Sequence, residues 1–261
     1  MTILDKIITN KKKEVADRKE KSPIRLLEKS EFFSSPVFSL KKYLLNDDIG
    51  IIAEYKRKSP SKGIINDKSR AEDVTKGYVS AGASALSILT DTEFFGGTNQ
   101  DLIAARKINQ CPILRKDFVI DEYQIIEAKS IGADVILLIA ACLVPAEVKR
   151  LTALAKNLGL EVLLELHAEE ELGHICDGIE LIGINNRDLK TFEVDIERSL
   201  RMAKQIPADK IKVAESGISD AEIIKRFKKA GFKGFLIGET FMKEEYPGKA
   251  LEKFVKKIKQ Y

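Results

Sequence analysis

Residues 134–166 read DVILLIAACLVPAEVKRLTALAKNLGLEVLLEL. An apolar run of strand length at 134–140 is followed by a helical pattern at 145–158 and by a second apolar run at 161–166. Gly159 stands where the helix should end, as helix C-termini favour. Strands that are apolar throughout and joined through a helix are typical of a parallel sheet covered by helices.

The same strand-helix unit recurs from residue 50 to the end of the sequence. Further apolar runs predict strands at 50–55, 85–90, 111–117, 181–186, 211–216 and 234–238. Further helical patterns lie at 70–81, 99–108, 122–131, 169–175, 196–205, 220–230 and 248–259. Eight such units predict a closed (β/α)8 TIM barrel of the α/β class. A doubly wound open sheet is the alternative, but no G-x-G-x-x-G sequence follows the first strand.

Residues 1–47 are predicted to form a mostly helical extension packed on the barrel. Ile3, Ile7 and Val15 recur at helical spacing, and the opposite face of this segment is charged. We expect residues 1–261 to form a single barrel domain, because no linker or low-complexity segment interrupts the pattern.

Composition narrows the class of partner. Lysine and arginine number 44 against 40 acidic residues, and no basic stripe is interleaved with aromatic residues, so no nucleic-acid partner is expected. A mild positive balance suits a small anionic ligand. The three cysteines include no C-x-x-C pair and there are only two histidines, which predicts a reducing cytoplasm and no metal site. No apolar stretch approaches the length of a membrane span, so no membrane partner is expected.

Charged and amide side chains concentrate at the C-terminal ends of the predicted strands. In a (β/α)8 barrel these ends meet at one mouth and supply the catalytic groups. A single buried ion pair there would only close the core, but burying so many charges is costly and indicates function. The matching positions at the starts of the strands do not carry such a ring of charge, and the exception among them is Glu161. The residues at these ends are Glu54, Lys56, Asp91, Lys116, Glu165, Asn185, Arg187, Glu215 and Ser216, of which the lysines, glutamates, asparagine and arginine are expected to converge on the mouth.

Glycines follow the seventh and eighth strands. Ser216-Gly217 and Gly238-Glu239 each precede a helical start. Loops at these two places commonly bind phosphate through backbone N–H groups. Ordinary tight turns are the alternative interpretation of either pair alone.

Two other features give weaker signals. His167 and His174 are not spaced as a ligand pair, and a helix-start or surface role is expected for them. Phe94 or Phe95 could cover an aromatic ligand as part of a mobile flap, or could anchor the loop in the core.

Taken together, the motifs resemble the indole-3-glycerol-phosphate synthase family. The matching stretches cover residues 50–243 in order, and the most specific are KRKSPSKG (56–63), LRKDF (114–118) and GINNRDL (183–189). The resemblance implies a carbon-carbon lyase of tryptophan biosynthesis. It would close the ring of 1-(2-carboxyphenylamino)-1-deoxyribulose 5-phosphate and release CO2 and water to give indole-3-glycerol phosphate.

The resemblance also implies a role for each matched residue. Lys116 would be the ring-closure acid, Lys56 would assist or act in dehydration, and Glu165 would be the base or an electrostatic partner. Glu54 and Asn185 would orient the lysines and the substrate, with Arg187 and Glu215 nearby. The residues expected to hold the phosphate are Ser59, Ser216, Gly217, Gly238 and Glu239. Those expected to flank the aromatic ring are Pro60, Phe95, Phe118, Leu137 and Leu163.

No cofactor is implied, because a lysine acid and a glutamate base can serve both steps. Two alternatives remain: another phosphate-sugar barrel enzyme, such as a Schiff-base aldolase using Lys116 or Lys56, and a catalytically silent barrel acting as a binding subunit. The intact set of charges argues against the silent barrel. The expected partner is a small phosphorylated substrate, and a cytoplasmic monomer is expected.

Overall fold

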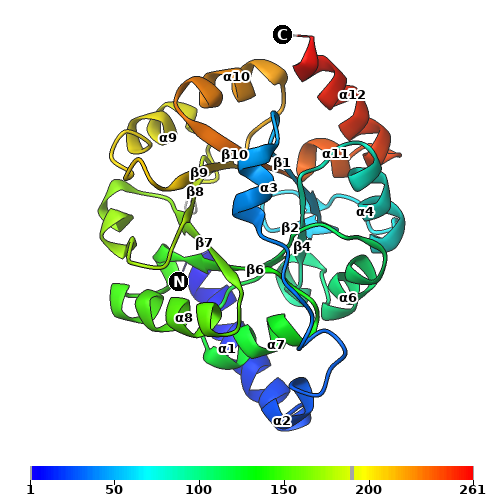
Figure 1. Ribbon diagram of the computed structural model, residues 1–261, viewed down its shortest axis with the longest axis vertical. Helices are drawn as coiled ribbons and strands as arrows, with labels where there is room; N and C mark the ends of the chain where they lie inside the picture. Colours follow the sequence, from blue (N-terminus) through cyan, green and yellow to red (C-terminus); the bar gives the residue numbers. More distant parts are fainter. Residues whose placement is uncertain (1, 189–190, 261) are drawn as a thin grey trace.

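The computed structural model describes residues 2–188 and 191–260, and its eight long strands close into a parallel barrel (Figure 1). The order around the barrel is β1-β10-β9-β8-β7-β6-β5-β4. The strands are β1 (Ile51–Tyr55), β4 (Ala85–Leu89), β5 (Ile113–Lys116), β6 (Val135–Ile139), β7 (Glu161–Leu166), β8 (Leu181–Asn185), β9 (Ile211–Glu215) and β10 (Phe232–Ile237). The predicted TIM barrel is therefore confirmed, and the open sheet is excluded.

Helices surround this barrel, close to the positions that the sequence predicts (Figure 1). They are α4 (Ala71–Ser80), α6 (Asn99–Ile108), α7 (Glu122–Ser130), α8 (Pro145–Asn157), α9 (Ile196–Met202), α10 (Ala221–Lys229) and α12 (Pro247–Lys259). The helix expected at 169–175 is instead a 3-10 helix, η2 (Glu169–His174). Gly173 lowers the helix propensity of this segment.

Several short elements near the strand ends were not predicted. They are the antiparallel pair β2 (Lys58–Ser59) and β3 (Gly63–Ile64), together with α5 (Thr92–Phe95) and η1 (Ala140–Cys142). The helical start expected after Gly238 is the short helix α11 (Glu239–Met242). Elements of two to four residues carry no measurable periodicity, so the sequence pattern cannot reveal them.

The N-terminal extension contains α1 (Ile3–Lys21), α2 (Ile24–Leu27) and α3 (Leu40–Asn46). In Figure 1, α3 lies over the centre of the barrel. Leu40 and Leu44 of α3 are fully buried and pack against the side chains inside the barrel. Glu161 accepts hydrogen bonds from Ser39 Oγ (2.5 Å) and from Lys41 N (3.1 Å). The charge at the start of β7 therefore anchors α3, which closes the end of the barrel opposite the mouth.

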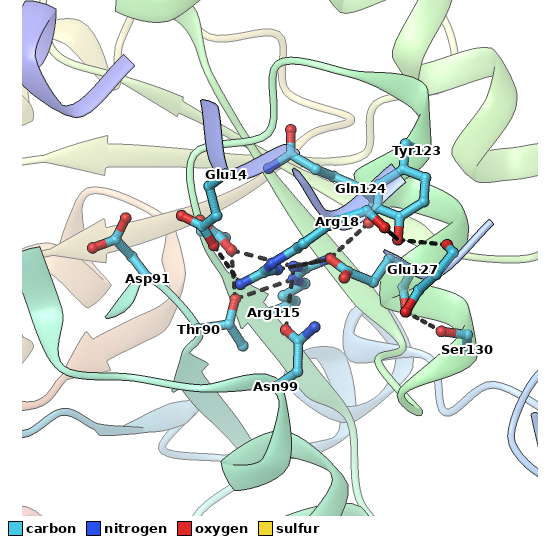
Figure 2. Close-up of polar contacts among 12 residues, drawn as sticks. Glu14, Arg18, Thr90, Asp91, Asn99, Arg115, Tyr123, Gln124, Glu127 and Ser130 are labelled. Atoms are coloured by element: carbon cyan, nitrogen blue, oxygen red, sulfur yellow. Dashed lines mark hydrogen bonds and ion pairs between the residues drawn. The ribbon is translucent and has the colours of Figure 1, made fainter. Parts of the chain in front are cut away.

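A buried polar network joins α1 to β5 and α7 (Figure 2). Arg115 is fully buried, donates to Gln124 O (2.7 Å) and pairs with Glu127 (2.6 Å). Glu127 also pairs with Arg18 of α1 (2.9 Å). A buried guanidinium is tolerated only when its donors are satisfied, and the barrel itself supplies the acceptors for Arg115. Arg18 of α1 adds a second cation to Glu127 and so ties α1 to this network.

A second contact from α1 reaches the same region. Lys11 has only 1% of its side chain exposed, and its Nζ lies 2.9 Å from Asp91 and 2.8 Å from Asp117. Asp117 and Arg115 are the two neighbours of Lys116 in the chain. Asp117 therefore contacts α1 directly through Lys11, and Arg115 is linked to α1 through Glu127, which pairs with Arg18. The side chain of Lys116 between them faces the mouth.

None of the helices in the described residues combines the length and the apolar character needed to cross a membrane. The described residues do not include residues 1, 189, 190 and 261. All four belong to the expected single domain, and residue 189 is the last of the GINNRDL motif.

Candidate active site

A single cavity occupies the mouth where the predicted residues converge. It is lined by the C-terminal strand ends, by the loop after β1, by the loops after β8, β9 and β10, and by the first turns of α1. The expected residues in its wall are Glu54, Lys56, Ser59, Pro60, Phe95, Lys116, Phe118, Leu137, Glu165, Asn185, Arg187, Glu215, Ser216, Gly217, Gly238 and Glu239. The structure thus brings together every predicted site residue except Leu163.

Lys116 is the centre of the charged part of the cavity. Its Nζ lies 2.5 Å from Glu165 Oε2 and 2.8 Å from Glu215 Oε2. The side chain is 14% exposed, whereas the two carboxylates are almost entirely buried. One ammonium therefore bridges two carboxylates from β7 and β9, and it remains accessible from the cavity.

This bridge shifts the protonation of all three groups. Burial acts to lower the pKa of Lys116, but Glu165 and Glu215 outweigh burial and raise it. Burial acts to raise the pKa of Glu165, but Lys116 and His167 together hold that pKa well below its usual range. Burial raises the pKa of Glu215 to about 8, although Lys116 opposes the shift. Near neutral pH the arrangement favours a protonated lysine beside an ionised Glu165.

Lys56 and Glu54 form a second pair on the same side of the cavity. Lys56 Nζ lies 2.7 Å from Glu54 Oε1, and Glu54 is buried while Lys56 is 17% exposed. The two residues alternate with Tyr55 along β1, so they share a face. This pair accounts for the carboxylate in β1, because Glu54 holds Lys56, the first residue of the KRKSPSKG segment (56–63).

Asn185 and Arg187 extend the polar wall from β8. Asn185 Nδ2 donates to Glu165 Oε1 at 3.1 Å. Its Oδ1 accepts from the backbone N–H of Arg187 at 3.0 Å, which fixes the amide orientation. Arg187 in turn lies 3.6 Å from Glu239 Oε2, beside the loop after β10.

Apolar side chains form another part of the cavity wall. The rings of Phe95 and Phe118 lie 6.0 Å apart, and Leu137 and Pro60 also line the cavity. Leu163 is the exception among the predicted ring contacts. It is fully buried in the cluster inside the barrel and does not line the cavity. Leu163 sits one layer below Glu165 because alternate residues of a strand occupy successive layers of the barrel.

The loop after β9 has an unusual backbone. Ser216 and Gly217 both have positive φ, at 65° and 68°. For a serine this conformation is strained, and such strain concentrates at functional sites. A Cβ at Gly217 would lie 2.3 Å from Val194 Cγ1, so glycine is required there by space as well as by φ.

The loop after β10 faces the same part of the cavity. α11 begins after Gly238, which offers no side chain to cap the first N–H groups of the helix. Lys62 Nζ, from the loop after β1, lies 3.7 Å from Glu239 Oε1. Both expected phosphate loops and two cations therefore meet at one end of the cavity.

Known proteins similar to this chain identify its family. The family description "Indole-3-glycerol phosphate synthase" matches residues 4–254. The chain belongs to the indole-3-glycerol phosphate synthase family. It is 52% identical over 256 residues to the indole-3-glycerol phosphate synthase of Bacteroides thetaiotaomicron, with 98% of each chain covered. It is 44% identical over 259 residues to that of Caldanaerobacter subterraneus subsp. tengcongensis, with 98% of this chain and 99% of the relative covered.

Solved structures that resemble this indole-3-glycerol phosphate synthase family member agree on the fold. Tryptophan synthase subunit alpha from Legionella pneumophila gives a TM-score of 0.61 at 14% identity, over 85% of this chain and 97% of the other. Thiamine phosphate pyrophosphorylase from Pyrococcus furiosus gives a TM-score of 0.59 at 15% identity, over 83% of this chain and 98% of the other. The family match and the two relatives confirm the resemblance that the motifs indicate, while the solved structures show the fold alone.

The family member's cavity also contains residues that the sequence did not suggest. They are Ile3, Leu4, Ile7, Ser61, Leu89, Asp117, Ile139, Phe192, Val194, Ile218, Ser219, Leu236, Ile237, Thr240 and Lys243. The α1 residues were missed because nothing in an amphipathic pattern says where a helix docks.

His167 is a further residue that the sequence interpretation underrated. Its backbone N–H donates to Glu171 at the start of η2, as the helix-start alternative expects, but the side chain is 7% exposed, so the surface alternative is wrong. Its Nε2 lies 3.1 Å from Glu165 Oε1. A signal was available, because 165 and 167 fall on the same side of an extended chain.

Proposed function

We propose that the protein converts 1-(2-carboxyphenylamino)-1-deoxyribulose 5-phosphate into indole-3-glycerol phosphate, CO2 and water. It acts as a carboxy-lyase of tryptophan biosynthesis, as its family membership supports. The observation that carries the proposal is the bridge of Lys116 between Glu165 and Glu215, in a cavity with an apolar wall and with phosphate loops at one end.

Ring closure needs an acid at the ketose oxygen. In our proposal the aromatic carbon that bears the carboxylate attacks the ketose carbon, while Lys116 donates a proton to the carbonyl oxygen. The new carbon-carbon bond leaves a hydroxyl group on the ketose carbon. Loss of CO2 then returns its bonding electrons to the ring and restores aromaticity.

Dehydration needs both an acid and a base. An ammonium, either Lys56 or Lys116, protonates the hydroxyl group, which leaves as water. Glu165 removes a proton from the neighbouring CH2 carbon, and the electron pair forms the indole double bond. The low pKa of Glu165 keeps it ionised for this step, and a positioned base of this kind contributes a rate factor of about 10²–10⁴. No electrons are exchanged with another molecule, so these steps need no redox cofactor.

The two ends of the substrate suit the two ends of the cavity. We propose that the phosphate binds to the backbone N–H groups after β9 and β10, with Ser59 and the nearby cations in support. The aromatic ring lies between the Phe95–Phe118 wall and Leu137. Glu54 and Asn185 orient Lys56 and Glu165, as their contacts at 2.7 and 3.1 Å support.

The raised pKa of Lys116 speaks against the Schiff-base alternative. Burial opposes the shift, but the two carboxylates dominate and keep the amine protonated. A Schiff base needs a neutral amine as the nucleophile, and enzymes that use one lower the lysine pKa. The pairing here favours an acid instead.

The direct test is turnover of the substrate by purified protein, followed by indole fluorescence, with the Lys116→Met variant as the control. We expect fluorescence to rise with wild type and to stay near background with the variant. Inorganic phosphate should inhibit competitively. No product from folded wild-type protein would overturn the proposed function.

We also propose that the enzyme works as a cytoplasmic monomer. One chain supplies the acids, the base, the apolar wall and both phosphate loops. Its three cysteines are free, as suits a reducing compartment. A sedimentation coefficient that corresponds to a dimer at micromolar concentration would contradict the monomer.

A further inference from the structure

His167 occupies an environment that the fold does not require of a histidine. It follows β7 directly and is 7% exposed. Neither ring nitrogen makes a well-aligned hydrogen bond with any group in 2–188 or 191–260, and both nitrogens are shielded from solvent. A buried polar side chain without partners is costly, and an apolar residue would fill the same space at less cost.

The one close polar neighbour of the ring is a carboxylate oxygen of the proposed base. His167 Nε2 lies 3.1 Å from Glu165 Oε1. That distance suits a hydrogen bond, although the alignment is poor. Contacts of this kind in free enzymes often become well aligned only when the substrate binds.

The contacts of Glu165 divide between its two oxygens. Oε2 faces Lys116 at 2.5 Å, whereas Oε1 faces Asn185 Nδ2 at 3.1 Å and His167 Nε2 at 3.1 Å. Donors from β5, β8 and the end of β7 therefore surround one carboxylate. Asn185 already holds Oε1 by a hydrogen bond, and a donor at His167 Nε2 would hold it from a second side and keep Oε2 directed toward Lys116 and the cavity.

We infer that His167 is a positioning residue for Glu165, holding Oε1 through an Nε2–H donor so that the ionised carboxylate faces the substrate. This inference rests on the proposed function for its kinetic consequences, but not for the contact itself. A hydrogen bond to the charged form stabilises it, so His167 helps to keep Glu165 ionised. His167 contributes to the lowered pKa of that carboxyl, after burial and Lys116.

Other charged groups face the same pair and must be considered in any pH experiment. Lys116 from β5 and Glu215 from β9 are coupled to Glu165 through the shared ammonium. Glu171 of η2 accepts a hydrogen bond from the backbone N–H of His167 at 2.6 Å. Burial and then the charge of Glu165 raise the pKa of the Cys142 thiol in η1. Substitution of the His167 side chain leaves these groups and the backbone contact to Glu171 in place.

The test compares His167→Gln with His167→Met. The two side chains have similar length and volume, but only glutamine can place an N–H donor where Nε2 lies. We expect His167→Met to lower kcat by about tenfold, the effect of losing one hydrogen bond to a charged group, with KM little changed. The acid limb of the pH–rate profile should move to higher pH, because Glu165 must stay ionised to act as the base. His167→Gln should restore most of kcat and of the acid limb.

His174 offers a matched control, because its ring nitrogens lie near the carbonyl oxygens of Glu171 (3.0 Å) and Leu143 (2.9 Å), not near Glu165. His174→Met should lower thermal stability without moving the acid limb. An NMR titration of the Glu165 side-chain carbon gives a readout that does not depend on turnover. We expect the pKa of Glu165 to rise in His167→Met and to return in His167→Gln.

The outcomes separate this inference from the proposed function. If wild type gives no product but the Glu165 titration moves as expected, the function is wrong and the positioning role stands. An unchanged titration and acid limb in folded His167→Met, or equal losses in the Gln and Met variants, would overturn the inference.

Discussion

Gly238 lies directly against Glu54. A Cβ added at Gly238 would come within 2.5 Å of Glu54 Oε1 and within 3.1 Å of its Cδ. The glycine after β10 therefore has a second constraint besides its place in a proposed phosphate loop. It leaves space for the carboxylate that holds Lys56.

This contact predicts that Gly238→Ala affects chemistry and not only binding. The methyl group would displace Glu54 and with it Lys56, so we expect kcat to fall by about tenfold or more, since small displacements of catalytic groups are costly. Steady-state kinetics measures this. Gly173→Ala is the control, because a Cβ there meets nothing within 4 Å. A rise in KM with kcat unchanged would mean that Gly238 serves the phosphate alone.

The geometry around Lys116 predicts that arginine cannot replace it. Nζ fits between two carboxylate oxygens at 2.5 and 2.8 Å, a space for a compact ammonium rather than a planar guanidinium. Arginine is also a poor proton donor, because it is effectively never deprotonated. We expect Lys116→Arg and Lys116→Met each to lower kcat by about 10²–10⁴-fold. Substantial rescue by arginine would leave Lys56 as the better candidate for the acid.

Glu215 should make stability depend on pH. Burial raises its folded-state pKa to about 8 from an ordinary value of 4.5, so between these values the folded protein holds a proton that the unfolded chain lacks. Ionisation of the buried Glu215 therefore destabilises the folded protein. This destabilisation is absent below pH 4.5, grows as pH rises, and is complete above about pH 8. We expect the Tm of Glu215→Gln relative to wild type to increase from pH 5 to pH 9.

Thermal unfolding at pH 5, 7 and 9 measures this difference. Glu170→Gln, at an exposed carboxylate, controls for the loss of one charge. A Tm difference for Glu215→Gln that stays constant across this range would show that Glu215 is ionised throughout.

The buried contacts of Lys11 predict that α1 unfolds together with the barrel rather than as a separate segment. Substituting Lys11 with methionine would leave Asp91 and Asp117 buried with less compensation, beside the network of Figure 2. Breaking a buried ion pair costs about 3–5 kcal/mol, so we expect a loss of unfolding free energy of that order. Because we propose that residues 1–47 and the barrel form one domain, urea unfolding should remain a single transition.

Lys21→Met on the same helix is the matched control, since Lys21 is 72% exposed and an exposed pair is worth about 1 kcal/mol or less. If Lys11→Met is no more destabilising than Lys21→Met, the buried contacts of α1 contribute little. Two separate urea transitions in wild type would contradict the single domain.

The sequence predicted the barrel because its information is local and repeated. Each strand is a short apolar run, each helix has its own period, and residues such as Glu54 and Glu165 stand out because they are charged residues within otherwise apolar runs. The convergence of Lys116 with Glu165 then follows from the fold, since all the strand ends of a closed parallel barrel meet at one mouth.

What the sequence could not show depends on distant packing. The docking of Ile3 and Ile7 on the cavity is set by Lys11 and Arg18 meeting partners some eighty or more positions away in the chain. The burial of His167 depends on how η2 folds over the end of β7. The family resemblance implied that Leu163 flanks the aromatic ring, but Leu163 lies one layer too deep along the barrel axis to line the cavity.

Steady-state kinetics of Glu165→Gln tests the central claim most directly. Glutamine keeps the size of the side chain and its contact with Asn185, but it removes the charge that pairs with Lys116 and the base that removes the proton. The account predicts that kcat falls by about 10²–10⁴-fold while KM changes little. A fall of less than about tenfold, with the variant folded, would contradict the assignment of Glu165 as the base, since a general base contributes more than that.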